Sequence, residues 1–402
     1  MSTSPKKKSR LVESGQQSPS LSVGAGGEAA GRAASPQADS AVTAEIHSLL
    51  TDVYGPWPSS TFPQPLSKAE AGPSAEGDQR RYLWTDAFGV MGFLALASQD
   101  PDNAEVHVGA ARSLIEATER TLGRPRDASL PMERETENDR KLTSFDAQRS
   151  TGFVGLRIGK VRALSEGTDA GMTFDGMYWH YVDKWLFALL RFAQASGDDE
   201  MLLHAAAVAS KVFRRFFREG RGVYWKLSTD GKPVEGMTDD DSLSALVVFS
   251  CIQCALETKG KTGIISLNKE IDALRTALGG YHSPGTSDPL GWGFKWWKAQ
   301  WTCDEACIRQ LLQRGDAALS ERHAGLPFRL YGALIGCRLS GTRGADLQRR
   351  ASSLLSKDGL LSQVDRSEDP ESGLWGINKV MRAVALDPSA MRRREDEPDV
   401  VV

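Results

Sequence analysis

The chain has 402 residues, a length that suits one large domain or two modest ones. Hydrophobic residues make up 40% of the sequence and charged residues 25%, so the chain can bury a sizeable core. The 49 basic and 52 acidic residues leave a formal net charge of −3, which excludes a generally basic nucleic-acid-binding protein. The 10 tryptophans are the least ordinary feature of the composition, and they favour a ligand that stacks on aromatic rings.

The first residues carry a basic run, Lys6 to Arg10, but no apolar segment of the length that a secretory signal requires. We therefore expect a cytoplasmic protein, with a nuclear address as the alternative interpretation of the basic run. The longest apolar stretch, 245–256, is too short to span a bilayer, so we expect no membrane partner. The cysteines are sparse and odd in number, which suits a reducing compartment.

Low-complexity composition marks both ends of the chain. Residues 1–40 are rich in Ser, Gly, Ala, Pro and Gln and hold almost no large apolar side chains, so burial cannot offset the entropy of ordering. We predict a disordered tail over 1–40, one folded domain over 41–390 and a second disordered tail over 391–402. Inside the domain, residues 124–151 are polar and aperiodic, which indicates a long loop.

Between the two tails, apolar residues recur at helical spacing. The periodicity predicts helices over 41–54, 84–98, 103–122, 176–195, 200–217, 241–257, 264–278, 295–319 (long enough for two), 327–339, 344–355 and 374–386. Alternating strand patterns are nearly absent, and 222–227 is the best strand candidate. Regularly spaced helices without a sequence repeat of fixed period favour an all-α protein built as a closed ring of helical hairpins over a solenoid.

Three near matches to ligand-binding motifs lack the context that those motifs need. The glycine-rich run 24–29 lies in the predicted tail with no strand before it, and 255–262 follows a helix where a phosphate-binding loop would follow a strand. Cys251 and Cys254 have no second Cys or His pair at metal-binding spacing, so we assign them to the core. We therefore expect no cofactor and no metal.

Two segments in the first half of the chain place charged groups beside aromatic residues or glycines. In 81–89, Asp86 stands near Trp84 at a predicted helix start, where it is either a helix cap or a functional acid. In 155–160, two glycines indicate a tight loop, which either lies on the surface or places Arg157 and Lys160 in a site.

The segment 174–185 is the densest polar and aromatic stretch of the chain. One helical face of it predicts core packing. Its first turn holds Asp175, Tyr178, Trp179 and His180, which point into a pocket mouth or else pack against neighbouring helices.

The segment 224–241 brings Trp225, Glu235 and three consecutive aspartates, with Asp240 at their centre, to the start of a helix. Paired carboxylates serve as general acid and base when their surroundings separate their pKa values. The alternative is that the aspartates cap the helix that follows. A second group of tryptophans has helical spacing and is assigned to packing: Trp292, Trp296, Trp297 and Trp301.

Several blocks of the sequence are familiar when taken together. The blocks are LWTDAFGVMGFLALA, LGRPRD, GLRIGK, DGMYWHYVDKWLFALLRFAQASGD, YWKLSTD and GINKVMRAVAL. In this order they resemble a mostly fungal family of the six-hairpin glycosidase-like superfamily, across residues 80–390. The resemblance implies an (α/α)6 toroid that binds ligands at one end, among the loops and helix ends of the inner ring. His180 matches one of a histidine pair that similar sequences show, whereas position 179 here is Trp.

The resemblance also implies a carbohydrate or another small polar ligand. Our first hypothesis is a glycoside hydrolase whose candidate acid and base are Asp86, Asp175 and Asp240. Its expected substrate-binding residues are Trp84, Arg157, Lys160, Tyr178, Trp179, His180, Trp225 and Glu235. The alternatives are a non-catalytic carbohydrate-binding protein and a sugar epimerase or isomerase, in which His180 would need His282 or His323 as a partner. Two carboxyl groups across a pocket favour the hydrolase, and two histidines favour the epimerase.

Overall fold

A computed structural model of the protein describes the following residues: 36–72, 79–123, 156–162, 174–228, 232–234, 239–279, 286, 288–302, 304–320, 326–356 and 373–400. The side chains of 36–39, 239 and 240 lie outside this description. So do residues 1–35, which make up most of the predicted N-terminal tail, and the loop predicted over 124–151. The first helix begins at Pro36, slightly before the predicted start of the folded domain.

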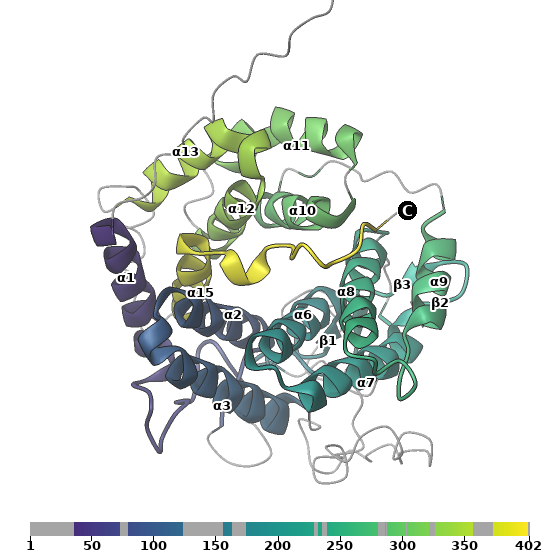
Figure 1. Ribbon diagram of the computed structural model, residues 1–402, viewed down its shortest axis with the longest axis horizontal. Coiled ribbons are helices and arrows are strands. Elements are labelled where there is room, and N and C mark those ends of the chain that lie inside the picture. The colour runs from purple at the N-terminus through teal and green to yellow at the C-terminus, as the bar shows by residue number, and fades with distance from the viewer. Residues whose placement is uncertain are drawn as a thin grey trace, which may run out of the picture.

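The described helices alternate between an outer and an inner ring (Figure 1). The outer ring consists of α1 (Pro36–Tyr54), α3 (Ala104–Leu122), α7 (Asp199–Phe216), α9 (Asn268–Ala277), α11 (Glu305–Ala318) and α13 (Ala345–Leu355). The inner ring consists of α2 (Leu83–Gln99), α6 (Trp179–Ser196), α8 (Asp239–Thr258), α10 (Pro289–Thr302), α12 (Pro327–Leu339) and α15 (Trp375–Leu386). Because α15 packs against both α1 and α2, the ring closes. The protein is an (α/α)6 toroid of helical hairpins, and the predicted fold class is confirmed.

The burial pattern of each helix explains its ring. In α2 every residue from Leu83 to Leu96 is buried, because an inner helix is covered on all sides. In α3 the buried residues recur every three or four positions, as in a helix with one covered face. Among the described residues, α8 alone is long and apolar enough to cross a membrane by length and composition. Most of that window (72%) is buried inside the protein, as expected for an inner-ring helix.

Each predicted helix is present, and the 295–319 segment is two helices, α10 and α11. Asp304 caps the start of the second helix, because its carboxylate accepts hydrogen bonds from the backbone N–H groups of Ala306 and Cys307. An aspartate in this position satisfies N–H groups that have no partner within the helix, and so it fixes where the helix begins.

The strand predicted over 222–227 is divided into two short strands, which Tyr224 and Trp225 separate. The described strands form two antiparallel pairs: β2 (Phe217–Arg218) with β3 (Gly222–Val223), and β1 (Met177–Tyr178) with β4 (Lys226–Leu227). In the second pair Met177 lies opposite Leu227, and Tyr178 opposite Lys226. This pairing brings the 224–228 segment against the start of α6.

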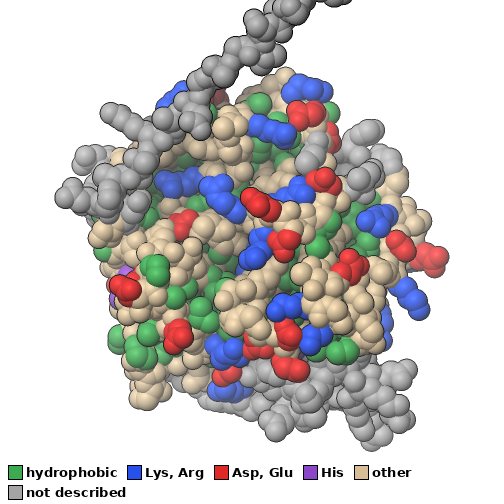
Figure 2. All heavy atoms as spheres, in the orientation of Figure 1, with side chains coloured by type: hydrophobic (Ala, Val, Ile, Leu, Met, Phe, Trp, Pro, Cys, Tyr) green, Lys and Arg blue, Asp and Glu red, His purple; other side chains and the backbone are tan. Residues whose placement is uncertain are grey.

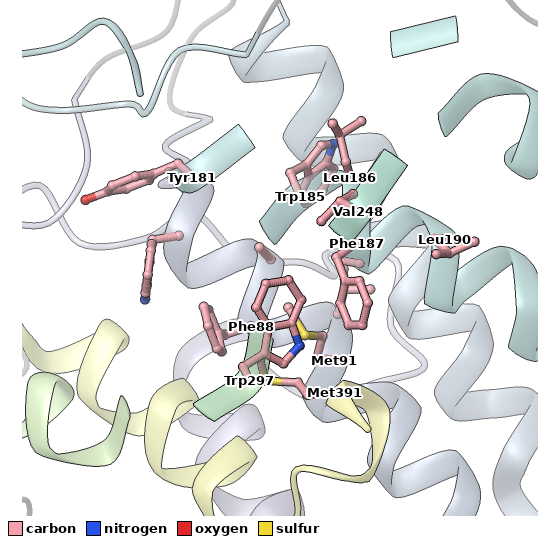
Figure 3. Packing of buried hydrophobic residues seen from close by; sticks show 14 of the residues in the cluster. Phe88, Met91, Tyr181, Trp185, Leu186, Phe187, Leu190, Val248, Trp297 and Met391 are labelled. Atoms are coloured by element: carbon pink, nitrogen blue, oxygen red, sulfur yellow. The ribbon is translucent and has the colours of Figure 1, made fainter. Parts of the chain in front are cut away.

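Aromatic and sulfur side chains fill the ring interior. Figure 3 shows Phe88 and Met91 from α2, Phe187 from α6 and Trp297 from α10 gathered around one point. The Phe187 and Trp297 rings are 5.0 Å apart, edge to face. The tryptophan group expected to pack does so, because every member of it is at most 2% exposed: Trp292, Trp296, Trp297 and Trp301.

Helices α10 and α12 approach each other closely at three glycines. A Cβ atom on Gly293 would lie 2.0 Å from the carbonyl oxygen of Gly332, and one on Gly336 would lie 2.6 Å from the Cα of Gly293. Only residues without a side chain permit these two backbones to touch.

The C-terminal strap, residues 387–400, crosses the middle of the ring (Figure 1). Arg191 of α6 donates hydrogen bonds to the backbone oxygens of Ala390 and Arg392 and to the carboxylate of Glu397. The backbone N–H of Val400 donates to the Trp301 oxygen over 2.9 Å. The prediction of a disordered tail is therefore wrong for residues 391–400. Their charged composition is typical of a solvated tail, but inner-ring helices supply buried partners that the local sequence does not show.

Candidate functional site

The two ends of the ring have very different connections. Segments that lead from an inner helix to the next outer helix are short, from 2 residues (197–198 and 303–304) to 9 residues (259–267). Segments that lead from an outer helix to the next inner helix range from 8 residues (319–326) to 56 residues (123–178). Binding and catalytic groups concentrate on long connections that a rigid scaffold positions. We therefore place the candidate site at the end where the inner helices begin, the loop-rich end.

The strap covers the opposite end of the ring. Met391 of η5 (Ser389–Met391) is fully buried and lies beside Trp297 and Met91 in Figure 3. The face shown in Figure 2 carries positive and negative side chains interspersed, without a large patch of one sign. The strap end is therefore closed by packed side chains, which leaves the loop-rich end for a ligand.

Aromatic residues converge at the loop-rich end from the starts of two inner helices. Trp84 lies on the interior face of α2, 5.0 Å from the Tyr181 ring and 6.1 Å from the His180 ring of α6. Its indole Nε1–H donates to the sulfur of Met381 on α15. The Tyr178 ring packs edge to face on Trp225 at 5.5 Å, because the β1–β4 pairing holds the two segments together.

His180 is partly exposed and lies at the centre of this aromatic group. Its ring is 4.8 Å from that of Tyr181 and 5.9 Å from that of Tyr178. Burial among these rings, with added repulsion from Lys184 and Arg329, lowers the pKa of His180 to about 3. The imidazole is therefore neutral at neutral pH and offers one donor and one acceptor.

Tyr82 and Tyr181 bring two phenol groups together beside His180. Their hydroxyl oxygens are 2.6 Å apart. Burial raises the pKa of Tyr181 to about 12 and that of Tyr82 well above its ordinary value, so both hydroxyls keep their protons. The site residues expected from the sequence include neither Tyr82 nor Tyr181. Only the ring closure, which places the starts of α2 and α6 side by side, identifies them.

Two lysines lie over the tyrosine rings. The Nζ atom of Lys160 is 4.6 Å from the Tyr82 ring centre, and the Nζ of Lys226 is 4.7 Å from the Tyr178 ring centre. Such contacts stabilise a partly desolvated ammonium group by about 0.5–2 kcal/mol. Of the two cations expected from the 155–160 loop, Lys160 therefore reaches the aromatic group.

An ion pair lies deeper in the ring interior. The Nζ of Lys184 is 2.9 Å from Oδ2 of Asp183, and it sits 4.3 Å from the Trp297 ring centre. Ser244 of α8 donates a hydrogen bond to the same Asp183 oxygen. Burial lowers the pKa of Lys184, and attraction to Asp183 and to Asp241 opposes that shift. The first turn of α8, which holds Asp241, thus acts on the same interior space as α6.

Asp175 lies apart from this space and is fully engaged by its neighbours. Its Oδ1 accepts hydrogen bonds from the backbone N–H groups of Gly159, Lys160 and Gly176, at 2.9 to 3.2 Å. Its Oδ2 is 3.0 Å from the Arg157 guanidinium, and both side chains are buried. The pair ties the 156–160 segment to the start of α6, which is a positioning role.

Asp86 faces outward from α2, between the two rings. Thr118 of α3 donates to its carboxylate over 3.0 Å, and a guanidinium nitrogen of Arg81 lies 3.6 Å away. Burial raises the pKa of Asp86 to about 6, and the positive charge of Arg81 opposes the shift. The fully buried Asp86 carboxylate is thus directed at α3, whereas Trp84 of the same helix is directed at the aromatic group.

Glu70 is a buried acid that the sequence did not single out. One carboxylate oxygen accepts from the Thr85 hydroxyl at 2.6 Å, and the other accepts from the Gly376 N–H at 3.2 Å. Burial raises the pKa of Glu70 to about 7. These two hydrogen bonds connect the start of α2 to the start of α15. Glu70 therefore helps to hold the ring closed.

Three of the expected site residues remain. One of them packs in the core, and the side chains of the other two are not described. Trp179 is fully buried against Phe216 and Phe249, between α6 and its neighbours α7 and α8. Glu235 lies outside the described residues, and so does the Asp240 side chain, although the backbone of Asp240 lies in the first turn of α8. Within the described ranges, no group of three or more His, Cys, Asp or Glu side chains is placed to hold a metal ion.

The chain is similar to solved structures of glycoside hydrolases. It matches a family 76 glycoside hydrolase from a bovine Bacteroides thetaiotaomicron strain at 12% identity and a TM-score of 0.51, over 87% of this chain and 78% of that one. A family 76 α-mannanase of Bacteroides thetaiotaomicron matches at 10% identity and a TM-score of 0.47, over 86% and 95% of the two chains. An inactive variant of an α-1,6-mannanase of Salegentibacter, in complex with α-1,6-mannotriose, matches at 10% identity and a TM-score of 0.46, over 87% and 99%.

No protein-family model and no curated protein matches the sequence. The first of these structural likenesses establishes the fold, the six-hairpin toroid, and at this identity it establishes the fold alone.

Proposed function

We propose that this protein is a carbohydrate-active enzyme that hydrolyses glycosidic bonds at the loop-rich end of the toroid. The observation that carries the proposal is that His180 lies beside the rings of Trp84 and Tyr178 at the start of the inner helices. Sugar rings stack on flat aromatic faces through their C–H groups and need polar groups around the rim. The fold supports the proposal, because it is shared with a family 76 glycoside hydrolase.

The first turn of α8 is the best source of the catalytic carboxylates. Asp241 is partly exposed and interacts with Lys184 across the ring interior. Asp240 precedes it directly, and we keep Asp240 as the proposed general acid or base with Asp241 as its companion. Hydrolysis needs two carboxyl groups about 5–10 Å apart on either side of the bond. Two consecutive residues of a helix reach this separation only if their side chains diverge. The distance between the Asp240 and Asp241 carboxyl groups therefore tests the assignment.

We assign Asp86 and Asp175 to positioning roles in this scheme. Each is fully buried beside a cation: Arg81 lies 3.6 Å from Asp86, and Arg157 donates a hydrogen bond to Asp175 over 3.0 Å. A general acid must come within hydrogen-bond distance of the leaving oxygen, directly or through one water. The Asp86 carboxylate faces Thr118 of the outer helix α3, and the Asp175 carboxylate faces Arg157 and the backbone of 159–160, so neither is directed at the aromatic group.

Epimerisation has less support. A histidine with a pKa of about 3 is a weak base, and His180 is in that state. His47, His107 and His204 belong to outer-ring helices, and His282 and His323 lie outside the described residues. No described histidine therefore stands opposite His180 to complete a pair.

A panel of p-nitrophenyl glycosides and neutral oligosaccharides tests the proposal. We expect the wild-type protein to release product from at least one member. Asp240→Asn and Asp241→Asn should lower kcat/KM by about 100-fold or more, because each removes a proton-transfer group. Asp304→Asn is the control, since Asp304 caps α11 at the strap end. Binding without hydrolysis of any member would overturn hydrolysis and leave a carbohydrate-binding protein.

A further inference from the structure

We infer that Tyr82, Tyr181 and His180 form the part of this site that reads sugar hydroxyls, and that the site takes a neutral sugar rather than an acidic one. The inference rests on the proposed function only for the location of the ligand. It concerns what the side chains recognise and not the bond that is cleaved.

One O–H donor of the phenol pair is left to bond a ligand. Two hydroxyls carry two protons, and the 2.6 Å contact between Tyr82 and Tyr181 uses one of them. No other hydrogen bond from either hydroxyl to a described residue is present. The second proton has no acceptor among the described residues, and both side chains are only 4% exposed. A buried donor that stays unused costs about 1–3 kcal/mol. A second acceptor is therefore expected at this point.

His180 and Arg329 add unused polar atoms from neighbouring elements. Neither ring nitrogen of His180 forms a hydrogen bond with the described part of the chain. Arg329, at the start of α12, is paired with Asp288 through Nη1, but its buried Nε has no partner among the described residues. With the phenol pair, these groups supply donors and an acceptor around the rings of Trp84 and Tyr181. This is the composition of a carbohydrate subsite: flat apolar faces with polar groups at the rim.

The charge state of the group favours a neutral ligand. Both phenols and the imidazole are uncharged at neutral pH, for the burial reasons given above. The cations around this group already have carboxylate partners. Asp183 pairs with Lys184 and Asp288 with Arg329, and the carboxylates of Glu70 and Asp175 attract Lys160, which lies over the Tyr82 ring. An acidic sugar would have to separate one of these pairs, whereas a neutral sugar hydroxyl bonds to the uncharged groups directly. Neutral donors and acceptors match hydroxyl groups without leaving a buried charge unpaired.

Calorimetric titration with matched trisaccharides tests the inference. The probes are α-1,6-mannotriose, maltotriose, cellotriose and xylotriose as neutral ligands and trigalacturonic acid as the acidic one. We expect wild-type protein to bind at least one neutral trisaccharide and to bind trigalacturonic acid at least 10-fold more weakly. Tyr82→Phe and Tyr181→Phe should each weaken binding of that neutral sugar by about 5- to 50-fold, because each removes a hydroxyl and keeps the ring.

Tyr224→Phe is the matched control and should change affinity less than 2-fold. Tyr224 directly precedes Trp225 in the chain, but its hydroxyl accepts a hydrogen bond from Arg218 on the outer side of the ring. Should a phenol variant fail to fold, His180→Gln is the second variant; it replaces a partly exposed side chain and should weaken the same binding. Preferential binding of trigalacturonic acid, no binding of any neutral probe, or unchanged affinity in the folded Phe and Gln variants would overturn the inference. Binding that weakens as expected, without hydrolysis, overturns the proposed function and leaves the inference standing.

Discussion

Arg191 and Glu397 form a buried ion pair between residues 206 positions apart in the chain. Arg191 belongs to the inner helix α6, and Glu397 belongs to the strap that covers the end of the ring. The same carboxylate accepts from the Trp301 indole at 3.0 Å and from the Arg394 backbone N–H at 3.1 Å. One side chain therefore fastens the strap to α6 and to α10.

We expect Glu397→Ala to destabilise the protein by about 3–5 kcal/mol, because it leaves the buried Arg191 guanidinium without its partner. The free energy of unfolding, measured in urea, checks this. Asp396→Ala is the matched control, since that side chain is largely exposed, and it should change stability by about 0.5 kcal/mol or less. Equal effects of the two variants would show that the strap contributes little to the fold.

Asp175→Asn should act on folding rather than on chemistry. The change weakens the ion pair with Arg157 and turns one of two acceptor oxygens into a donor, so we expect a loss of about 2–4 kcal/mol. Activity per folded molecule on any substrate found should stay within about 3-fold of wild type. The folded fraction of each variant is measured by circular dichroism, and each rate is divided by that fraction. A variant that is as stable as wild type but inactive would return Asp175 to the catalytic group.

The stability of the protein should fall with rising pH through Glu70. Its folded pKa of about 7 lies above the ordinary value of 4.5, so the folded protein binds the proton more tightly than the unfolded chain does. This contribution is fully present below pH 4.5 and is lost as the pH rises through 7. Glu70→Gln stays neutral, so relative to wild type it should gain up to about 3 kcal/mol between pH 4 and pH 8.

Urea denaturation at a series of pH values measures that difference. Glu105→Gln, on an exposed position of α3, is the control and should show a constant offset from wild type. A constant offset for Glu70→Gln as well would mean that Glu70 is ionised in the folded protein at neutral pH.

Gly293→Ala should destabilise the protein by about 2 kcal/mol or more, because the new Cβ would meet the Gly332 carbonyl oxygen at 2.0 Å and force α10 and α12 apart. The matched control is Gly109→Ala in α3, where a Cβ meets no atom within 4 Å. That change should stabilise the protein by up to about 1 kcal/mol, since alanine favours helix over glycine. Melting temperatures of the two variants should therefore move in opposite directions.

Helix positions and the all-α class follow from the sequence because they depend on local periodicity. The apolar spacing in 103–122 and 200–217 identifies α3 and α7. In α3 the covered face repeats every three to four residues, as the spacing predicts. The spacing of the tryptophans at 292–301 likewise predicts their packing. The split between α10 and α11 is also local, since Asp304 caps the second helix through its own next residues.

The role of each polar residue, in contrast, depends on a partner that the local sequence does not contain. Asp86 lies in the first turn of α2, and Asp175 precedes α6, both among aromatic residues. In the structure each is buried and connects two segments, Asp86 through Thr118 and Asp175 through Arg157. Tyr82 and Tyr181 are 99 positions apart, and only the closed ring sets their hydroxyls in contact. The strap has the composition of a solvated tail until Arg191 provides a buried counter-charge. Helical periodicity can be read from neighbouring residues in the sequence. The charge state, burial and hydrogen bonding of a side chain depend on the distant segments that the closed toroid brings beside it.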